Sequence, residues 1–75
     1  MHWIEIAHQR PAITAMGQTD HVLVAYYPQP NSDLQVAIAF YDQDARDSGW
    51  LQSGTFTPLR APRYWMPLPA VPSAR

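Results

Sequence analysis

Hydrophobic and polar positions alternate most clearly in DLQVAIAFYD, residues 33–42. An extended chain there puts the large apolar side chains on one side: Leu34, Val36, Ile38 and Phe40. The opposite side carries smaller or more polar groups, among them Ala37 and Ala39. The pattern predicts a β-strand whose large side chains face the core and whose alanines leave shallow space on the other face.

A second strand is indicated by HVLVAYYP, residues 21–28, an apolar run rich in Val and Tyr that ends at a proline. The segment PQPNSD lies between the two runs and contains two prolines, an Asn and a Ser, which are turn-forming residues. The two runs are therefore expected to form an antiparallel hairpin over residues 21–41, with a loop longer than two residues.

The N-terminal part of the chain predicts less regular structure. Alternation in HWIEIA, residues 2–7, indicates a short strand. Residues 11–16 allow one helical turn, because Pro11 suits the first helical position and Gly17 follows the end.

The C-terminal part predicts more short strands. WLQSGTFTP, residues 50–58, allows two very short strands around Ser53 and Gly54. YWMPLP predicts a final strand of at most four residues at a sheet edge or strand end, because Pro67 has no N–H to donate. Residues 70–75 are expected to form a flexible tail. The chain thus predicts one mainly β domain over residues 1–75: a small antiparallel sheet or partly open barrel of about five short strands, with at most one helical turn.

Composition limits how such a domain is stabilised. A chain of 75 residues buries only about 60% of the surface that its unfolded form exposes. There is no cysteine, so neither a disulfide nor a Cys-based zinc site supplements the core of this chain, of which 47% is hydrophobic. The thin core leaves a homo-oligomer, or stabilisation by a partner, as an expectation.

Charge and hydropathy bear on the partner and the compartment. The formal net charge is −1, and all five basic residues are arginines. This is not the positive footprint of a protein that binds duplex nucleic acid, so nucleic acid is the less favoured partner. No segment approaches the roughly 20 apolar residues of a membrane span, and the start is not that of a signal peptide. The expected location is the cytoplasm, with no membrane partner.

Catalytic and metal-binding patterns are weak. The three histidines, His2, His8 and His21, are scattered and have no Cys beside them, which argues against a metal site or cofactor. The acidic run DQDARDSGW lacks the Gly and Glu positions of a calcium loop. Serines occur in turn contexts without a G-x-S-x-G motif, and most carboxylates flank turns. We therefore expect no enzymatic activity.

The segment RYWMPLP, residues 63–69, carries the main candidate site. In a small β domain a tryptophan usually belongs to the core, so Trp65 has a structural interpretation. Strand geometry lets only one of two adjacent rings face that core, and an aromatic ring beside guanidinium groups is typical of protein-binding hot spots and of base-stacking surfaces. The candidate partner-binding residues are Trp50, Arg60, Arg63, Tyr64 and Trp65.

The order of short motifs along the chain also carries a resemblance. WIEI, RP, a glycine, VLVAYY, VAIAFYD, GW and WMPLP follow one another over nearly the whole length. In this order the chain resembles a family of small phage and prophage proteins, domain of unknown function number five hundred and fifty-one. The matching positions are Trp3, Ile4, Arg10, Pro11, Gly17, Val22 to Val24, Ala39, Tyr41, Gly49, Trp50 and Trp65 to Pro69. The resemblance implies a mobile-element context and no assigned activity.

Together these features predict a non-catalytic accessory protein of a phage or other mobile element, located in the cytoplasm of the host cell. Its expected partner is a host protein, and its expected effect is inhibition of a defence complex, as anti-CRISPR proteins do, or of a regulatory complex. The alternative is a module that binds a nucleotide or single-stranded nucleic acid through Trp65, Tyr64, Arg60 and Arg63.

Overall fold

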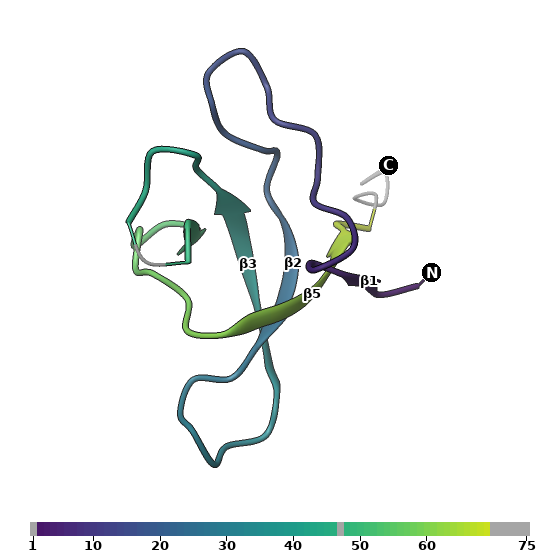
Figure 1. The fold of residues 1–75 in the computed structure, drawn as a ribbon, viewed down its shortest axis with the longest axis vertical. Helices are drawn as coiled ribbons and strands as arrows, with labels where there is room; N and C mark the ends of the chain where they lie inside the picture. The colour runs from purple at the N-terminus through teal and green to yellow at the C-terminus, as the bar shows by residue number, and fades with distance from the viewer. Residues whose placement is uncertain (1, 47, 70–75) are drawn as a thin grey trace, which may run out of the picture.

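The computed structural model describes residues 2–46 and 48–69, and in these residues it contains strands and irregular segments but no helix (Figure 1). The strands are β1 (Ile4–Glu5), β2 (Val22–Tyr26), β3 (Gln35–Tyr41), β4 (Trp50–Gln52) and β5 (Pro62–Pro67). They form one antiparallel five-stranded sheet in the order β1-β5-β2-β3-β4, which is not closed into a barrel. The predicted mainly β fold is confirmed. The predicted tail, residues 70–75, lies outside the described residues.

The β2–β3 hairpin forms as predicted. Its register runs from Val22 opposite Ala39 to Tyr26 opposite Gln35, and the connecting loop lies at the lower end of the molecule in Figure 1. A turn within the loop is closed by Ser32, whose hydroxyl accepts a hydrogen bond from the N–H of Gln29 at 3.1 Å. The hairpin supplies the two strands around which β5 and β4 assemble.

Strand β5 lies between β1 and β2, so residues near the two ends of the chain pair with each other. Trp65 is opposite Ile4 on one side and Val24 on the other. The strand spans six residues, longer than the predicted four. Pro62 and Pro67 occupy its two ends, where a missing N–H interrupts the fewest ladder hydrogen bonds, as the prediction for Pro67 required.

The predicted helical turn at residues 11–16 is wrong. Ile13 instead forms a bridge with Thr19, and the N–H of Thr14 donates to the carbonyl of Gln18 at 2.7 Å. Gly17 lies in the turn with φ of 80°, a left-handed conformation that glycine adopts without steric cost. A single helical turn gains too few hydrogen bonds to compete with this paired turn.

Only one of the two predicted strands around residues 53 and 54 is regular. After β4 the chain turns at Gly54, and it returns as an isolated bridge between Leu51 and Pro58. The N–H of Gln52 donates to the carbonyl of Thr57 at 2.8 Å, so the returning segment still covers the outer edge of β4.

The core lies on the side of β3 that the sequence did not predict. It consists of Val22, Val24, Ala39, Trp50, Leu59 and Trp65, each at most 7% exposed. Val36 and Ile38 face the other way and are 56% and 46% exposed. Both indole rings belong to the same core cluster as Ala39, so the alanine side of β3 faces the core.

Phe40 is a partial exception to this reversal. It shares the outer side with Ile38 yet is only 2% exposed. His21 stacks on its ring at a centroid distance of 4.8 Å, and Phe56 meets it edge-on at 5.9 Å. Phe40 is thus buried in a separate aromatic cluster at one end of the outer face.

Candidate functional site

Two of the sequence-predicted site residues belong to the core. Trp50 is 1% exposed and meets the ring of Tyr41 edge-on at 5.6 Å. Trp65 is 7% exposed, and its indole N–H donates to the carbonyl of Gln9 at 2.8 Å. Neither ring is free to stack on a base or to enter a pocket of a partner, so the structural interpretation of Trp65 is the one that the structure supports.

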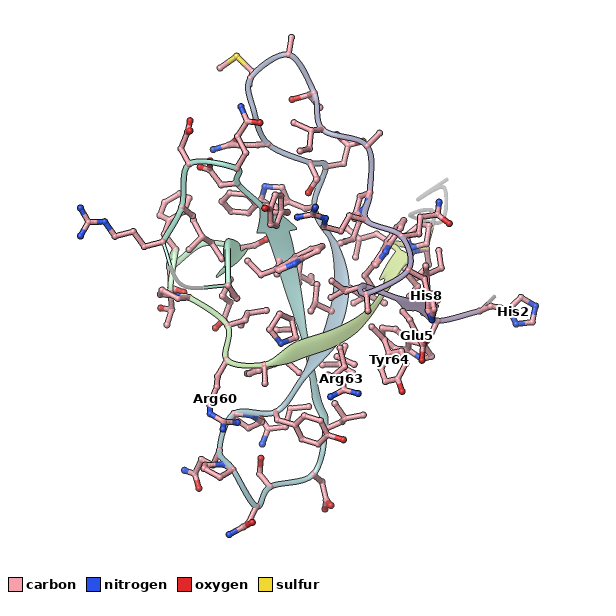
Figure 2. The ribbon with its side chains drawn as sticks, viewed as in Figure 1. His2, Glu5, His8, Arg60, Arg63 and Tyr64 are labelled. Carbon is pink, nitrogen blue, oxygen red and sulfur yellow. The ribbon has the colours of Figure 1, made fainter. Side chains whose placement is uncertain are left out.

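The two candidate arginines lie along the beginning of β5. Arg60 donates from a guanidinium nitrogen to the carbonyl of Tyr27 at 3.1 Å, which ties it to the end of the hairpin. Arg63 is exposed at a β-bulge, where Ala25 pairs with Tyr64 but Tyr26 pairs with Pro62. Figure 2 shows both side chains in the lower half of the view.

Tyr64 is half-buried and points to the face opposite the core. It is paired with Glu5 of β1, and Figure 2 shows Tyr64, Glu5 and His8 close together at the β1 side of the sheet. Glu5 and His8 form a contact of 2.7 Å between a carboxylate oxygen and Nε2. With Arg63, Tyr64 and Glu5 line an open cavity of about 440 Å³.

The outer face of the sheet carries a continuous apolar surface. The register places Ala25 beside Tyr64 and Val36 in one row, and Leu23 beside Met66 and Ile38 in the next. Trp3 and Leu34 adjoin the first row. We call this surface the open face; it comprises Trp3, Leu23, Ala25, Leu34, Val36, Ile38, Tyr64 and Met66.

The open face is apolar and accessible. Trp3 is 43% exposed and Leu34 39%, in addition to the two exposed residues of β3. A hollow of about 300 Å³ lies over Ala25, with walls formed by Trp3, Leu34, Val36 and Tyr64. Glu5 lies opposite Tyr64 at the β1 end of the first row, and its carboxylate contacts His8. The arrangement suits burial of apolar groups rather than proton transfer.

Sequence reasoning missed a second polar contact, between Ser53 and His21. The Ser53 hydroxyl lies 2.6 Å from Nδ1 of the imidazole, a pairing that in other settings activates a nucleophile. Within the described residues no carboxylate contacts this ring, which instead stacks on Phe40. The contact holds the imidazole over the aromatic cluster, and no local motif reveals it because the two residues are 32 positions apart.

A polar cluster occupies the end of the sheet where residues 14–19 and 42–46 meet. Asp42 accepts hydrogen bonds from the N–H of Asp44 at 2.9 Å and from the amide of Gln18 at 3.0 Å. These two contacts, the backbone one foremost, lower the pKa of Asp42 below its ordinary value. Nearby, Arg10 donates to the Tyr41 hydroxyl at 2.9 Å. The cluster fixes the loops at this end of the sheet.

Among residues 2–46 and 48–69 no three His, Asp or Glu side chains come together as a metal site would require. The same residues include no helix with the length and apolar character needed to cross a membrane.

Comparison of the chain with protein-family models, with curated proteins and with solved structures found no match.

Proposed function

We propose that this protein is a non-catalytic binding module that uses the open face to contact another protein. The observation that carries the proposal is the exposure of Val36 and Ile38, 56% and 46%, in the middle of a sheet strand. A sheet with two apolar faces needs a layer on each, and among residues 2–46 and 48–69 the chain covers only one of the two faces. A contiguous exposed apolar patch of this kind marks an interaction surface.

The chemistry of the face favours a protein over a nucleotide or nucleic acid. A surface that binds polyanions needs arginine or lysine with accessible rings. Arg63 lies in β5 and Arg60 lies just before it, both outside the open face, and the indole of Trp65 is in the core. The open face offers apolar area with an aromatic rim, the composition that anchors protein interfaces.

The resemblance of the chain to small phage and prophage proteins supports a partner in the host cell. A small accessory protein with an exposed apolar face can act by covering a surface that a host complex needs. We accordingly propose that the partner is a host protein of a defence or regulatory complex, which the bound module inhibits.

The experiment places a photo-crosslinking residue at position 36 or at the exposed control position Gln29 in the hairpin loop. The protein is expressed in host cells, and the crosslinked partner is identified, purified and titrated with wild-type protein. Val36→Glu should weaken that binding at least about tenfold because it places a charge in an apolar contact. Met16→Glu, a matched change at a loop residue that is 85% exposed, should leave binding unchanged.

A third arm tests the sequence-predicted arginines. Normal binding by the Val36→Glu protein, together with loss of binding by an Arg60→Ala, Arg63→Ala protein, would reject the open face and move the site to the beginning of β5. Crosslinking that is no stronger at position 36 than at position 29 would also contradict the proposal.

A further inference from the structure

No segment of the part of the chain that the structure describes lies over the open face, so water would contact the middle of the sheet. We infer that in the free protein this face packs against the open face of a second copy, so that self-association competes with binding of the partner. The inference rests on the proposed function, since it concerns the same surface. The inference identifies what covers the open face when no partner is bound: a second copy of the chain.

The area of the face is sufficient for a weak dimer. Trp3, Leu34, Val36 and Ile38 are each between 39% and 56% exposed, and Leu23, Tyr64 and Met66 are half-buried beside them. Large apolar side chains of this kind expose on the order of 500 Å² together. Two such faces bury at most about 1,000 Å², which is near the lower limit for a specific interface and therefore fits a weak dimer.

The charge distribution permits two identical faces to meet. An isologous interface brings each residue near its own copy or near its symmetry-related neighbours, so any charge at the centre would face a like charge. The rows centred on Ala25 and Leu23 contain no arginine, and Glu5 lies at their β1 end with His8 against it. Nothing at the centre of the face opposes self-pairing.

The shape of the face is self-complementary in the sense that a two-fold contact requires. The hollow over Ala25 has Trp3 and Tyr64 on one side and Val36 on the other. Ile38 stands in the next row as an exposed branched side chain, so one face offers both a recess and a residue to enter it. Two sheets packed in this way would lie about 10 Å apart, as in a β-sandwich.

Pairing through strand edges is disfavoured, which directs association to the face. At the β1 edge, the carbonyl of Glu5 already accepts hydrogen bonds from the N–H groups of His8 and Gln9, each at 3.0 Å. At the β4 edge, the N–H of Leu59 donates to the carbonyl of Trp50 at 2.8 Å. These internal bonds leave little unpaired backbone for a strand of another copy.

Residues 70–75 are a poor alternative cover for the open face. Residues 70–75, AVPSAR, contain one large apolar side chain, Val71. Such a segment cannot replace the several large side chains that a second copy would bring to the face.

The experiment measures the mass of the full chain by sedimentation from about 1 µM to about 500 µM, a range that spans micromolar dissociation constants. Trp3 provides a parallel signal, because it is 43% exposed while the other two tryptophans are buried. We expect a monomer–dimer equilibrium, with acrylamide quenching of tryptophan emission falling as the dimer forms.

Val36→Glu should raise the dimer dissociation constant at least about 100-fold, because each copy then buries a charge. Met16→Glu should leave it unchanged. A second variant, Val36→Thr with Ile38→Thr, keeps β-branching and strand propensity, and it should also dissociate the dimer while circular dichroism shows an unchanged fold.

A monomer at every concentration, with Trp3 equally quenchable throughout, would overturn the inference and leave the proposed function intact. A dimer that Val36→Glu does not weaken would overturn it as well, since another surface would then be responsible. The proposed function is contradicted by a different result: the purified crosslinked partner binds the Val36→Glu protein as tightly as it binds wild type.

Discussion

The indole N–H of Trp65 donates to the backbone carbonyl of Gln9 at a distance of 2.8 Å, across 56 positions of sequence. The ring is 7% exposed and belongs to the main core cluster. One side chain of β5 therefore both fills the core and holds the segment that follows β1 against the sheet.

The two roles of Trp65 can be separated by substitution. Trp65→Ala should lower the free energy of unfolding by about 3–5 kcal/mol, because it removes a buried ring and leaves a cavity. Trp65→Phe keeps an aromatic ring and loses the donor, so a smaller loss of about 1–2 kcal/mol is expected. Urea melts followed by circular dichroism give both values. Equal losses for the two variants would mean that the hydrogen bond, not the packing, dominates.

The two sides of β3 should differ in how strongly a change of side-chain size lowers the stability of the protein. Ala39 is fully buried, so Ala39→Leu should cost about 1–3 kcal/mol by overpacking. Ile38→Ala removes a side chain that is 46% exposed and should cost less than about 1.5 kcal/mol in the monomer. Denaturant melts at low protein concentration test this. A loss of several kcal/mol for Ile38→Ala would mean that Ile38 lies in the core, as the alternation pattern predicted.

Gly49 is expected to be intolerant of a side chain. Its φ is 83°, and a Cβ there would lie 2.6 Å from Cε1 of Tyr41. Gly49→Ala should therefore cost both backbone strain and displacement of the ring, about 2–4 kcal/mol in total. Near-ultraviolet circular dichroism should change as well, because Tyr41 packs against Trp50.

Gly54 supplies the control for this prediction. Its φ of 87° is nearly the same, but a Cβ there meets nothing within 4 Å. Gly54→Ala should therefore cost only the backbone strain, about 1–2 kcal/mol. The difference in melting behaviour between the two variants isolates the steric clash, and equal effects would show that the clash is relieved.

Stability should depend on the ionisation of Asp42. Hydrogen bonds from the N–H of Asp44 and then from Gln18 lower the pKa of this carboxyl below 3.8 in the folded protein. Its contribution to stability is thus present above pH 3.8 and is lost as the pH falls through the lower folded value.

Replacing Asp42 by Asn should flatten the dependence of unfolding free energy on pH in that acidic window, without changing its shape near neutral pH. Denaturant melts of both proteins across the window provide the measurement. The same slope in both proteins would mean that other carboxylates account for the acid response.

Local pattern was enough to predict the hairpin but not its buried side. Alternation in β3 separates large from small residues, and we assigned the large ones to the core. The assignment failed because Trp50 and Trp65 come from other strands and pack in the cluster that contains Ala39. Packing of large rings over small residues depends on strand order, which the pattern of one strand does not contain.

Local pattern likewise indicates only part of the candidate site. Adjacent residues of β5 must point to opposite faces, so the sequence required that Tyr64 and Trp65 separate, and they do. The open face itself combines residues of β2, β3 and β5 with Trp3, and its extent follows from the register. No local signal places the N-terminal Trp3 beside Leu34 and Val36, because β5 brings them together.

The position of β5 between β1 and β2 also sets an order of events during synthesis on the ribosome. Strands β2, β3 and β4 can pair as soon as they emerge, but β1 has to wait for a partner that is made some sixty residues later, between Pro62 and Pro67. Until then Val22 and Val24 lack the ring of Trp65 that packs with them, and pairing at such separation is slow. Released chains that end before residue 62 should be readily digested by protease, and resistance should appear only in chains that include β5.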